Sequence, residues 1–529
     1  MKHIINLIQY LLLAGAMLGA GGCGDFDQIN RNPNEVTKEQ LGRDFYDVGS
    51  SIKTLQSYVI PTEEHLYQFA ELLCGGSYAG YTETTVTNFI DKFSVYNPSE
   101  DWNSAQFVTV MKNFYPDYRA VMRKDNAVAQ ALARICRVAT MLRVTDTYGP
   151  IPYTGVVSED NKDESLEVAY DSQEEVYNAF FSDLNRAEEQ LQANINMSTE
   201  VLKLFDGVYG GDLHKWLKYL NSLRLRMAIR ISFANPTLAQ QIAEQAVSGG
   251  VIESNEDGAS LTVTQNRASM IINSWGDHRV GADIICYMNG YEDPRRAKYF
   301  TTVTTGTGED KKEVYAGMRI GTYTVDQTAD EKLYSMQIIK DTDPHLWMNA
   351  AEVTFLRAEG ALNGWAMGGD AADLYAKAIR LSFEERGVTG ADEYIADTQK
   401  KPEDYKDPKG QNNSTARSTI TIAWEEGTGA DVKERNLERI ITQKWIAIYP
   451  MATEAWAEFR RTGYPRLMPV PEGQNHSGGI IDSETMIRRL AYPAEEKSLN
   501  NANLQEAIGK LGGPDNGATP LWWDVRHAK

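Results

Sequence analysis

Cysteine is scarce in this chain, with 4 residues among 529. So few cysteines exclude a scaffold held together by disulfides. Positive charge is also short: 53 lysines and arginines face 73 aspartates and glutamates, which gives a formal net charge of −20. Because nucleic acid is bound by a net basic surface, this charge argues against a nucleic-acid partner. It also disfavours attraction to an anionic membrane by charge alone.

Motifs for catalysis and cofactors are missing as well. The sequence has no His-Glu-x-x-His, no paired-cysteine zinc pattern and no phosphate-binding Walker loop. Residues 75–79 depart from a serine-hydrolase elbow at the last position, which needs glycine. The seven histidines are scattered, and we expect His345, just after a proline, to be solvated or to cap a helix. We predict no enzyme activity, no metal and no cofactor.

The single long apolar run lies at the N-terminus, over residues 4–20. It is short for a membrane span of about 20 apolar residues, and it ends in small residues, as a secretory signal does. Cys23 follows directly and completes a sequence that resembles a bacterial lipobox, although Ala20 stands where that pattern prefers leucine. We predict a signal peptide at 1–22 and a lipid-anchored tether at 23–36 that begins with a lipidated Cys23. The alternative is cleavage nearby with Cys23 left free.

The rest of the chain has the apolar spacing of packed helices. Stripes with a period of 3.6 residues occur within 131–145, 212–232 and 437–448. Residues 345–387 form a predicted helix–turn–helix unit that resembles a tetratricopeptide repeat. Strand signals are few, at 259–264 and 314–325. We predict a mostly α fold of tetratricopeptide-like helix pairs packed against irregular loops, with a few short β-hairpins.

We expect residues 37–529 to form a single domain. The helical pattern is interrupted by a long polar loop excursion near 390–436, and loops of that length in compact domains are usually functional or mobile. Cys74, Cys136 and Cys286 all have apolar neighbours, so we predict that they are small buried residues.

Aromatic residues are plentiful, with 10 Trp, 27 Tyr and 15 Phe. Several lie in segments rich in glycine and asparagine, outside the helical stripes, where a flat ring can serve as a platform for a ligand such as a sugar. The alternative is that these rings fold back into the core. The best candidates for ligand contact are Trp102 and Trp275. The further candidates are Tyr78, Tyr81, Tyr287, Asn273, Asp277 and Arg279.

Short motifs follow one another along almost the whole chain. They are Asn-x-Asn-Pro-Asn at 30–34, Asp-x-Tyr-Gly-x-Ile-Pro-Tyr at 146–153, Asn-Ser-Leu-Arg at 221–224, Asp-Pro-Arg at 293–295 and Glu-Ala-Trp-Ala-Glu-Phe-Arg-Arg-Thr-Gly-Tyr-Pro at 454–465. In this order the motifs resemble those of the SusD/RagB family of outer-membrane lipoproteins, in its SusD-like branch. We expect most motif residues to serve the architecture, with Asp293 capping a helix and Arg460 and Arg461 paired beside Glu458.

The resemblance implies a lipoprotein anchored in the outer membrane and facing the cell exterior. It further implies a SusC-like TonB-dependent transporter as the partner and a nutrient as the ligand, most often an oligosaccharide. Three alternatives stay open at this stage. They are a peptide-binding RagB-like subunit, a surface glycoside hydrolase, and a helical scaffold without a small ligand.

Overall fold

The computed structural model describes residues 45, 47–158 and 160–526. The predicted signal peptide, Cys23 and the predicted tether lie outside the described residues. From Val48 onward the chain forms one compact unit. Within the described residues, no helix is both long enough and apolar enough to cross a membrane.

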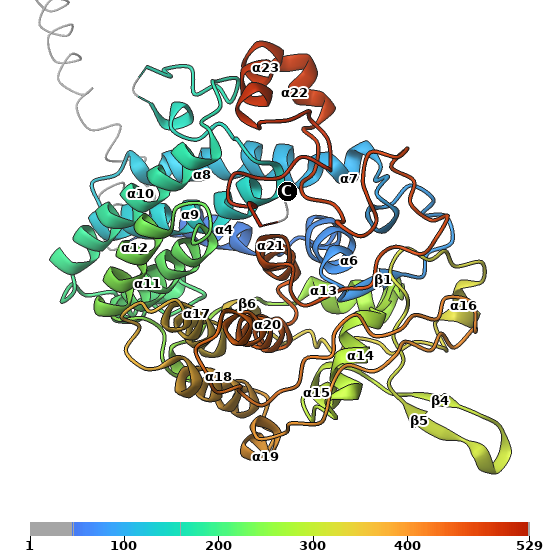
Figure 1. Ribbon diagram of the computed structural model, residues 1–529. Coiled ribbons are helices and arrows are strands. Elements are labelled where there is room, and N and C mark those ends of the chain that lie inside the picture. The colour runs from blue at the N-terminus through green and yellow to red at the C-terminus, as the bar shows by residue number, and fades with distance from the viewer. Residues whose placement is uncertain (1–44, 46, 159, 527–529) are drawn as a thin grey trace, which may run out of the picture. The chain divides into compact units, whose positions relative to one another are not determined.

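Paired helices lie together on one side of this unit (Figure 1). They are α4 (Gly49–Val59), α8 (Val110–Met122), α9 (Ala127–Tyr148), α10 (Gln173–Ala193), α11 (Leu213–Arg230), α12 (Pro236–Ser248), α17 (Ala350–Leu362) and α18 (Ala371–Glu385). Helix α9 packs on α10, α11 on α12, and α17 on α18. The predicted fold class, mostly α with tetratricopeptide-like pairs, is confirmed.

The helix ends follow the local sequence. Asp212 accepts hydrogen bonds from two backbone N–H groups and begins α11, while Asn235 caps α12, whose first turn contains Pro236. Gly149 ends α9 with a φ of 97°, and a Cβ there would lie 2.9 Å from a methyl carbon of Leu511. Glycine is therefore required at this turn, both for its backbone conformation and for the close approach of Leu511.

Shorter elements occur among irregular loops, and of these α6, α7, α14 and α16 lie toward the other side of the unit (Figure 1), whereas η6 contacts α17 and α18. The helical ones before residue 200 are α5 (Glu64–Tyr67), η1 (Gln68–Gly75), α6 (Gly76–Tyr78), η2 (Phe93–Val95), α7 (Glu100–Ser104), η3 (Ala105–Thr109) and η4 (Gly155–Val157). Those after it are η5 (Leu202–Leu204), η6 (Asn255–Asp257), α13 (Arg267–Met270), η7 (Ile271–Trp275), α14 (Ala282–Gly290), α15 (Arg296–Tyr299), η8 (Gly308–Asp310) and α16 (Gln327–Asp330).

The C-terminal part completes the unit. Its elements are α19 (Ala391–Ile395), α20 (Ala430–Ala447), α21 (Ala452–Thr462), α22 (Ala494–Leu499) and α23 (Asn501–Lys510). Between α18 and α20, the chain of the predicted excursion is irregular apart from α19. Helices α20 and α21 lie between the paired helices and the loop-rich side (Figure 1).

The described strands form three two-stranded antiparallel sheets. They pair β1 (Thr82–Thr84) with β3 (His278–Val280), β2 (Ala259–Leu261) with β6 (His345–Met348), and β4 (Val303–Thr305) with β5 (Lys312–Val314). Only β4 and β5 form a hairpin. The other two sheets join segments far apart in sequence. Of the two predicted strand segments, 259–264 contains β2, but the prediction for 314–325 is wrong, because only Val314, the last residue of β5, belongs to a strand there.

The predicted helix over 345–362 begins later than expected. Residues 345–348 form strand β6, and Asn349 then caps α17 by accepting a hydrogen bond from the backbone N–H of Glu352 at 2.9 Å. The expectation of a solvated or capping His345 is wrong, because β6 carries that side chain into the interior, where the residue is 4% exposed. Cys74, Cys136 and Cys286 are buried, as predicted, and their thiols are free.

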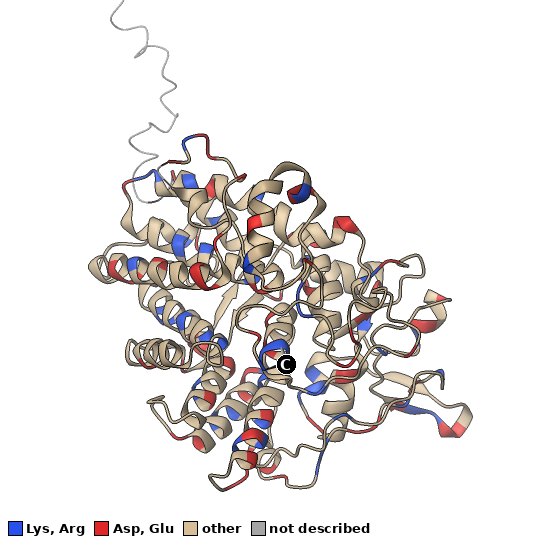
Figure 2. Cartoon of the chain, turned by 45° about the horizontal axis from the view of Figure 1, so that its top comes forward, with Lys and Arg blue, Asp and Glu red and all other residues tan. Residues whose placement is uncertain are grey.

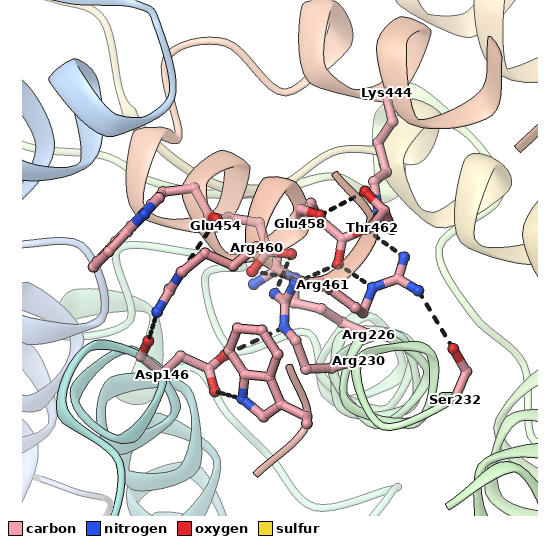
Figure 3. Close-up of polar contacts among 12 residues, drawn as sticks. Asp146, Arg226, Arg230, Ser232, Lys444, Glu454, Glu458, Arg460, Arg461 and Thr462 are labelled. Atoms are coloured by element: carbon pink, nitrogen blue, oxygen red, sulfur yellow. Dashed lines mark hydrogen bonds and ion pairs between the residues drawn. The ribbon is translucent and has the colours of Figure 1, made fainter. Parts of the chain in front are cut away.

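Two of the sequence motifs, at 146–153 and 454–465, contribute to a buried cluster of charges (Figure 3). Five basic and five acidic side chains, all buried or nearly so, come from α9, α11, α17, α20 and α21: Arg226, Arg230, Lys444, Arg460, Arg461, Asp146, Glu352, Glu359, Glu454 and Glu458. Elsewhere, acidic and basic residues are interspersed along helices and loops (Figure 2). We refer to the ten charged residues named above as the central charge cluster.

Glu458 occupies a central position in this cluster. Its carboxylate accepts hydrogen bonds from Arg230, Lys444 and Arg461. Arg461 also pairs with Glu359 at 2.6 Å, as expected for an internal pair. Arg460 differs from expectation: its guanidinium donates to the backbone oxygen of Asp146 at 2.5 Å and stacks 3.5 Å above the Trp456 ring. The expectation that Asp293 caps a helix is wrong, because the cap residue of α15 is Arg295; Asp293 instead pairs with Arg295 at 2.6 Å with both side chains fully buried, which is still an architectural role.

Candidate ligand-binding surface

The two tryptophans predicted for ligand contact are both partly exposed. Trp102 lies in the short helix α7, and Trp275 ends η7 just before Gly276, which adopts a φ of 73°. Although 173 positions apart in sequence, they lie on either side of the same segment, the continuous helix formed by α5 and η1. The fold therefore brings both candidates to one surface.

Two rings of this helix connect the tryptophans. His65 and Phe69 are four residues apart, which places them on one helix face. The ring centroid of His65 lies 5.5 Å from that of Trp275 and 6.4 Å from that of Phe69. Phe69 in turn stacks on Trp102 at 5.7 Å with an interplanar angle of 28°. Trp275, His65, Phe69 and Trp102 thus form a continuous row, which we call the aromatic platform.

Both ends of the aromatic platform are supported from behind. Trp102 packs edge-on against Phe89 at 4.7 Å and stacks on the fully buried Phe93 at 6.1 Å. Trp275 packs against a buried cluster that includes Ile271 and Ile272. Because each ring is held by neighbouring rings or by core side chains, the platform can offer a large flat area with little loss of side-chain freedom on binding.

Polar groups lie beside the Trp275 end. Asn273 is exposed, and its amide donates to Ser269 Oγ at 3.1 Å and to the Ile339 carbonyl at 3.0 Å. Asp277 is half-buried and accepts a hydrogen bond from Gln68 Nε2 at 2.8 Å. Partial burial raises the pKa of Asp277, and this hydrogen bond opposes the shift. Asn273 and Asp277 thus lie beside the Trp275 end of the aromatic platform.

Arg279 plays a different part from the one predicted. The residue is 4% exposed, and its guanidinium donates to the carbonyls of Gly276 at 3.1 Å, His278 at 2.8 Å and Glu331 at 3.2 Å. Burial lowers the pKa of this guanidinium. Arg279 therefore fixes the turn that follows Trp275 and acts on the platform through that turn.

The three predicted tyrosines lie in the interior instead. Tyr78, Tyr81 and Tyr287 are 5%, 1% and 3% exposed. The Tyr78 ring packs on Trp456 at 4.9 Å, and the hydroxyls of Tyr81 and Tyr287 donate to the carbonyls of Trp445 and Arg466. The structure does not bring these three tyrosines to the aromatic platform. Their neighbouring glycines and small residues allow helices to pack closely around them, which buries the rings. Sequence reasoning missed His65, Phe69 and Phe89. The available signal was the spacing of four residues between His65 and Phe69, which places them on one helix face.

One group of side chains could hold a metal ion. Among the described residues, Glu63, Glu64 and His65 form the one set of at least three ligand atoms within 4.8 Å of one another. Glu63 already caps α5, because one of its carboxylate oxygens accepts a hydrogen bond from the Leu66 N–H at 2.7 Å. The other carboxylate oxygen of Glu63 lies 3.2 Å from Nδ1 of His65. Since Glu63 and His65 are exposed and Glu63 is engaged locally, the geometry assigns no ion to them.

Comparison with known proteins decides the family. A family model described as "SusD-like: Susd and RagB outer membrane lipoprotein" matches residues 28–524. The chain belongs to this SusD/RagB family. The resemblance carried by the sequence motifs is thereby confirmed.

Solved structures of SusD homologues superpose over almost the whole chain. A homologue from Bacteroides thetaiotaomicron is 47% identical with a TM-score of 0.85, covering 91% of this chain and 99% of its own. A homologue from Bacteroides uniformis is 43% identical with a TM-score of 0.85, covering 91% and 100%. A chitin-binding homologue from Flavobacterium johnsoniae is 37% identical with a TM-score of 0.81, covering 90% and 99%. A search of curated proteins found no match.

Proposed function

We propose that this SusD-like protein captures an oligosaccharide at the cell surface on the aromatic platform. The observation that carries the proposal is the continuous row formed by Trp275, His65, Phe69 and Trp102. Sugar rings present flat C–H faces that stack on aromatic rings, while their hydroxyls bond to polar side chains such as those of Asn273 and Asp277. The chitin-binding relative from Flavobacterium johnsoniae supports a glycan as the ligand.

We further propose that the bound glycan passes to a SusC-like TonB-dependent transporter in the same outer membrane. Membership of an outer-membrane lipoprotein family supports this location, with Cys23 as the proposed lipid anchor. In this proposal the protein binds the glycan without converting it, since no nucleophile–base pair was recognised in the sequence. A peptide is the second candidate ligand, because the family also takes its name from RagB.

The test is alanine substitution of the platform tryptophans. Trp102→Ala and Trp275→Ala should each weaken glycan binding by about tenfold or more, because truncation of a central aromatic anchor typically costs about 2 kcal/mol. The matched control is Trp365→Ala, which removes a partly exposed tryptophan in the turn between α17 and α18. Binding is measured by calorimetry on a panel of oligosaccharides and peptides, and melting temperature is recorded for every variant.

The outcomes separate surface binding from core packing. Loss of affinity with an unchanged melting temperature supports the platform. A lowered melting temperature with unchanged affinity in both variants contradicts it, because core tryptophans lose about 3–5 kcal/mol of folding stability on truncation. Binding of peptides but not glycans selects the second candidate ligand. Release of shorter sugars by the repurified protein during the titration contradicts binding without conversion.

A further inference from the structure

A second candidate site is a cavity of about 300 Å³ beyond the Trp275 end of the platform. It lies where η1, α15, β6, the end of α18 and the segment after α20 come together. Ile60 and Ile339 line the cavity and pack, together with Trp275, against one buried apolar cluster. Small-molecule sites usually have volumes of about 300–1,000 Å³, so this cavity suits one compact ligand rather than a long chain.

Three polar atoms of the tyrosine and histidine lining residues are buried without a hydrogen-bond partner among the described residues. They are the hydroxyls of Tyr299 and Tyr449 and Nε2 of His345, from residues that are 2%, 3% and 4% exposed. An unpaired buried polar group costs about 1–3 kcal/mol, so such groups usually have a partner. Burial lowers the pKa of His345 to about 4. The neutral ring can therefore donate to or accept from a ligand hydroxyl, according to its tautomer.

Arg386 offers a fourth unsatisfied group. Its Nη2 donates to the Tyr449 carbonyl at 3.1 Å, and its guanidinium lies 4.8 Å from the centre of the Tyr299 ring. Its Nε is buried and has no hydrogen-bond partner among the described residues. A guanidinium held in this way is well suited to a carboxylate, whose two oxygens match its planar donors.

Basic charge is left over around the cavity. Lys298 and Lys340 are exposed lining residues, and neither takes part in an ion pair among the described residues. The acidic lining residues are engaged: Glu71 accepts from Arg143 at 2.7 Å and from Thr453 Oγ1 at 2.7 Å. Glu385 pairs with Arg386 at 3.8 Å and accepts from the Asn349 side chain at 3.0 Å. Asp343 accepts from the Lys340 backbone N–H at 2.9 Å but takes part in no ion pair among the described residues. Two lysines against one carboxylate without an ion-pair partner leave an excess of positive charge, which favours an anion.

We propose that this cavity binds one acidic sugar unit, with its carboxylate toward Arg386, Lys298 and Lys340 and its hydroxyls toward Tyr449 and His345. The site is separate from the aromatic platform and does not depend on the proposed glycan capture there. Hydroxyls and a carboxylate on one ring-sized molecule match both the unsatisfied polar atoms and the leftover basic charge. A neutral sugar would satisfy only the first of these, and a simple carboxylate only the second.

In the experiment, the purified protein is titrated with glucuronate, galacturonate and N-acetylneuraminate, and binding is measured by calorimetry and by ligand-observed NMR. Glucose and acetate are the comparison probes. We expect saturable binding of at least one sugar acid, and at least tenfold weaker binding of glucose and of acetate. Binding of a methyl glucuronide as well would identify a chain end as the occupant, and binding of the free acid alone a monosaccharide; both support the site.

Two variants distinguish binding from a structural role. Tyr449→Phe removes a hydroxyl that has no hydrogen-bond partner in the described part of the chain, so it should weaken sugar-acid binding by about tenfold without lowering the melting temperature. Lys340→Gln should weaken binding of the acids but not of glucose. The matched control is Tyr287→Phe, whose hydroxyl donates to the Arg466 carbonyl, so it should lower the melting temperature and leave the affinity unchanged.

Three results overturn the proposal. The first is the absence of saturable binding of every acid up to about 10 mM, which is ten times the Kd of a weak 1 mM site. The second is binding of glucose or acetate as tight as that of the acids. The third is unchanged affinity in both Tyr449→Phe and Lys340→Gln. Trp102→Ala should leave sugar-acid binding intact. Failure of the aromatic platform and failure of this cavity are therefore distinguishable in one set of titrations.

Discussion

Neutralising Glu458 should destabilise the whole unit. Its carboxylate is 3% exposed and accepts from Arg230, Lys444 and Arg461. Burial favours the neutral form of Glu458, but these three neighbours outweigh it and hold the pKa of the carboxyl well below its ordinary value. At neutral pH the group is therefore charged, and Glu458→Gln leaves three buried cations without their shared partner.

The magnitude follows from the burial of the cluster. Breaking a buried ion pair by removing one partner costs about 3–5 kcal/mol, because the remaining charge is left uncompensated. Unfolding entropy near the melting temperature is about 2.1 cal/mol/K per residue, which over the roughly 480 residues of the unit gives about 1 kcal/mol/K. Glu458→Gln should therefore lower the melting temperature by about 3–5 °C.

Differential scanning calorimetry at pH 7.5 provides the measurement, with near-ultraviolet circular dichroism to verify native packing. The matched control is Glu484→Gln, which removes the same charge from an exposed pair with Arg417. Exposed pairs contribute about 0–1 kcal/mol, so the control should shift the melting temperature by about 1 °C or less. Equal shifts in the two variants would refute the idea that the central charge cluster stabilises the fold through Glu458.

Two further predictions concern the anchor and acid stability. Cys23→Ser should move the protein out of the outer-membrane fraction in high salt without detergent; retention there would show that another feature anchors it. Burial lowers the pKa of His278 to about 3 and of His345 to about 4, so both histidines stabilise the fold fully above about pH 6.5 and lose that contribution as the pH falls toward these values. Lowering the pH to 5 should therefore reduce the free energy of unfolding by about 2 kcal/mol per histidine. Scanning calorimetry of the double variant His278→Gln, His345→Gln should show a smaller drop in melting temperature between pH 7.5 and pH 5 than the wild type shows.

Much of the helical framework could be predicted from the sequence, because its signals are local. Capping residues such as Asn235, followed by Pro236, and the 3.6-residue stripe of α11 act within one segment. The described motif residues Asp146, Asp293 and Arg460 are buried, in line with the expected architectural role. What the sequence did not reveal was which distant residues meet: Asp146 and Arg230 form an ion pair at 3.3 Å across 84 positions of sequence.

The aromatic platform was only half predictable for the same reason. Trp102 and Trp275 stood out because each lies in a short polar segment without a long helical stripe. Their common surface depends on His65 and Phe69, and the contacts that join these four rings span up to 210 positions. Tyr78 and Tyr287 had the same sequence surroundings as the tryptophans, yet tertiary packing buried them. Local composition cannot distinguish an exposed ring from one covered by a distant segment.

The scaffold and the platform are joined at Glu71, on the same helix as Phe69. Its carboxylate accepts from the backbone N–H groups of Ala452 at 2.9 Å and Thr453 at 3.1 Å, where α21 begins, and from Arg143 at 2.7 Å. These contacts fix the helix that carries His65 and Phe69 against the helix that carries Glu458.

Glu71→Gln should therefore lower the melting temperature and also weaken glycan binding, because the aromatic platform loses the contacts that hold its helix against α21. Hydrogen bonds to a charged group contribute about 1.5–3 kcal/mol, which corresponds to about 2–3 °C in this unit. Glu458→Gln acts farther along α21 and should lower the melting temperature alone, with the affinity measured well below the transition. Equal affinity in wild type and Glu71→Gln would show that the platform keeps its geometry without this support, whereas a loss in Glu458→Gln of the same size would show that the central charge cluster itself sets the platform.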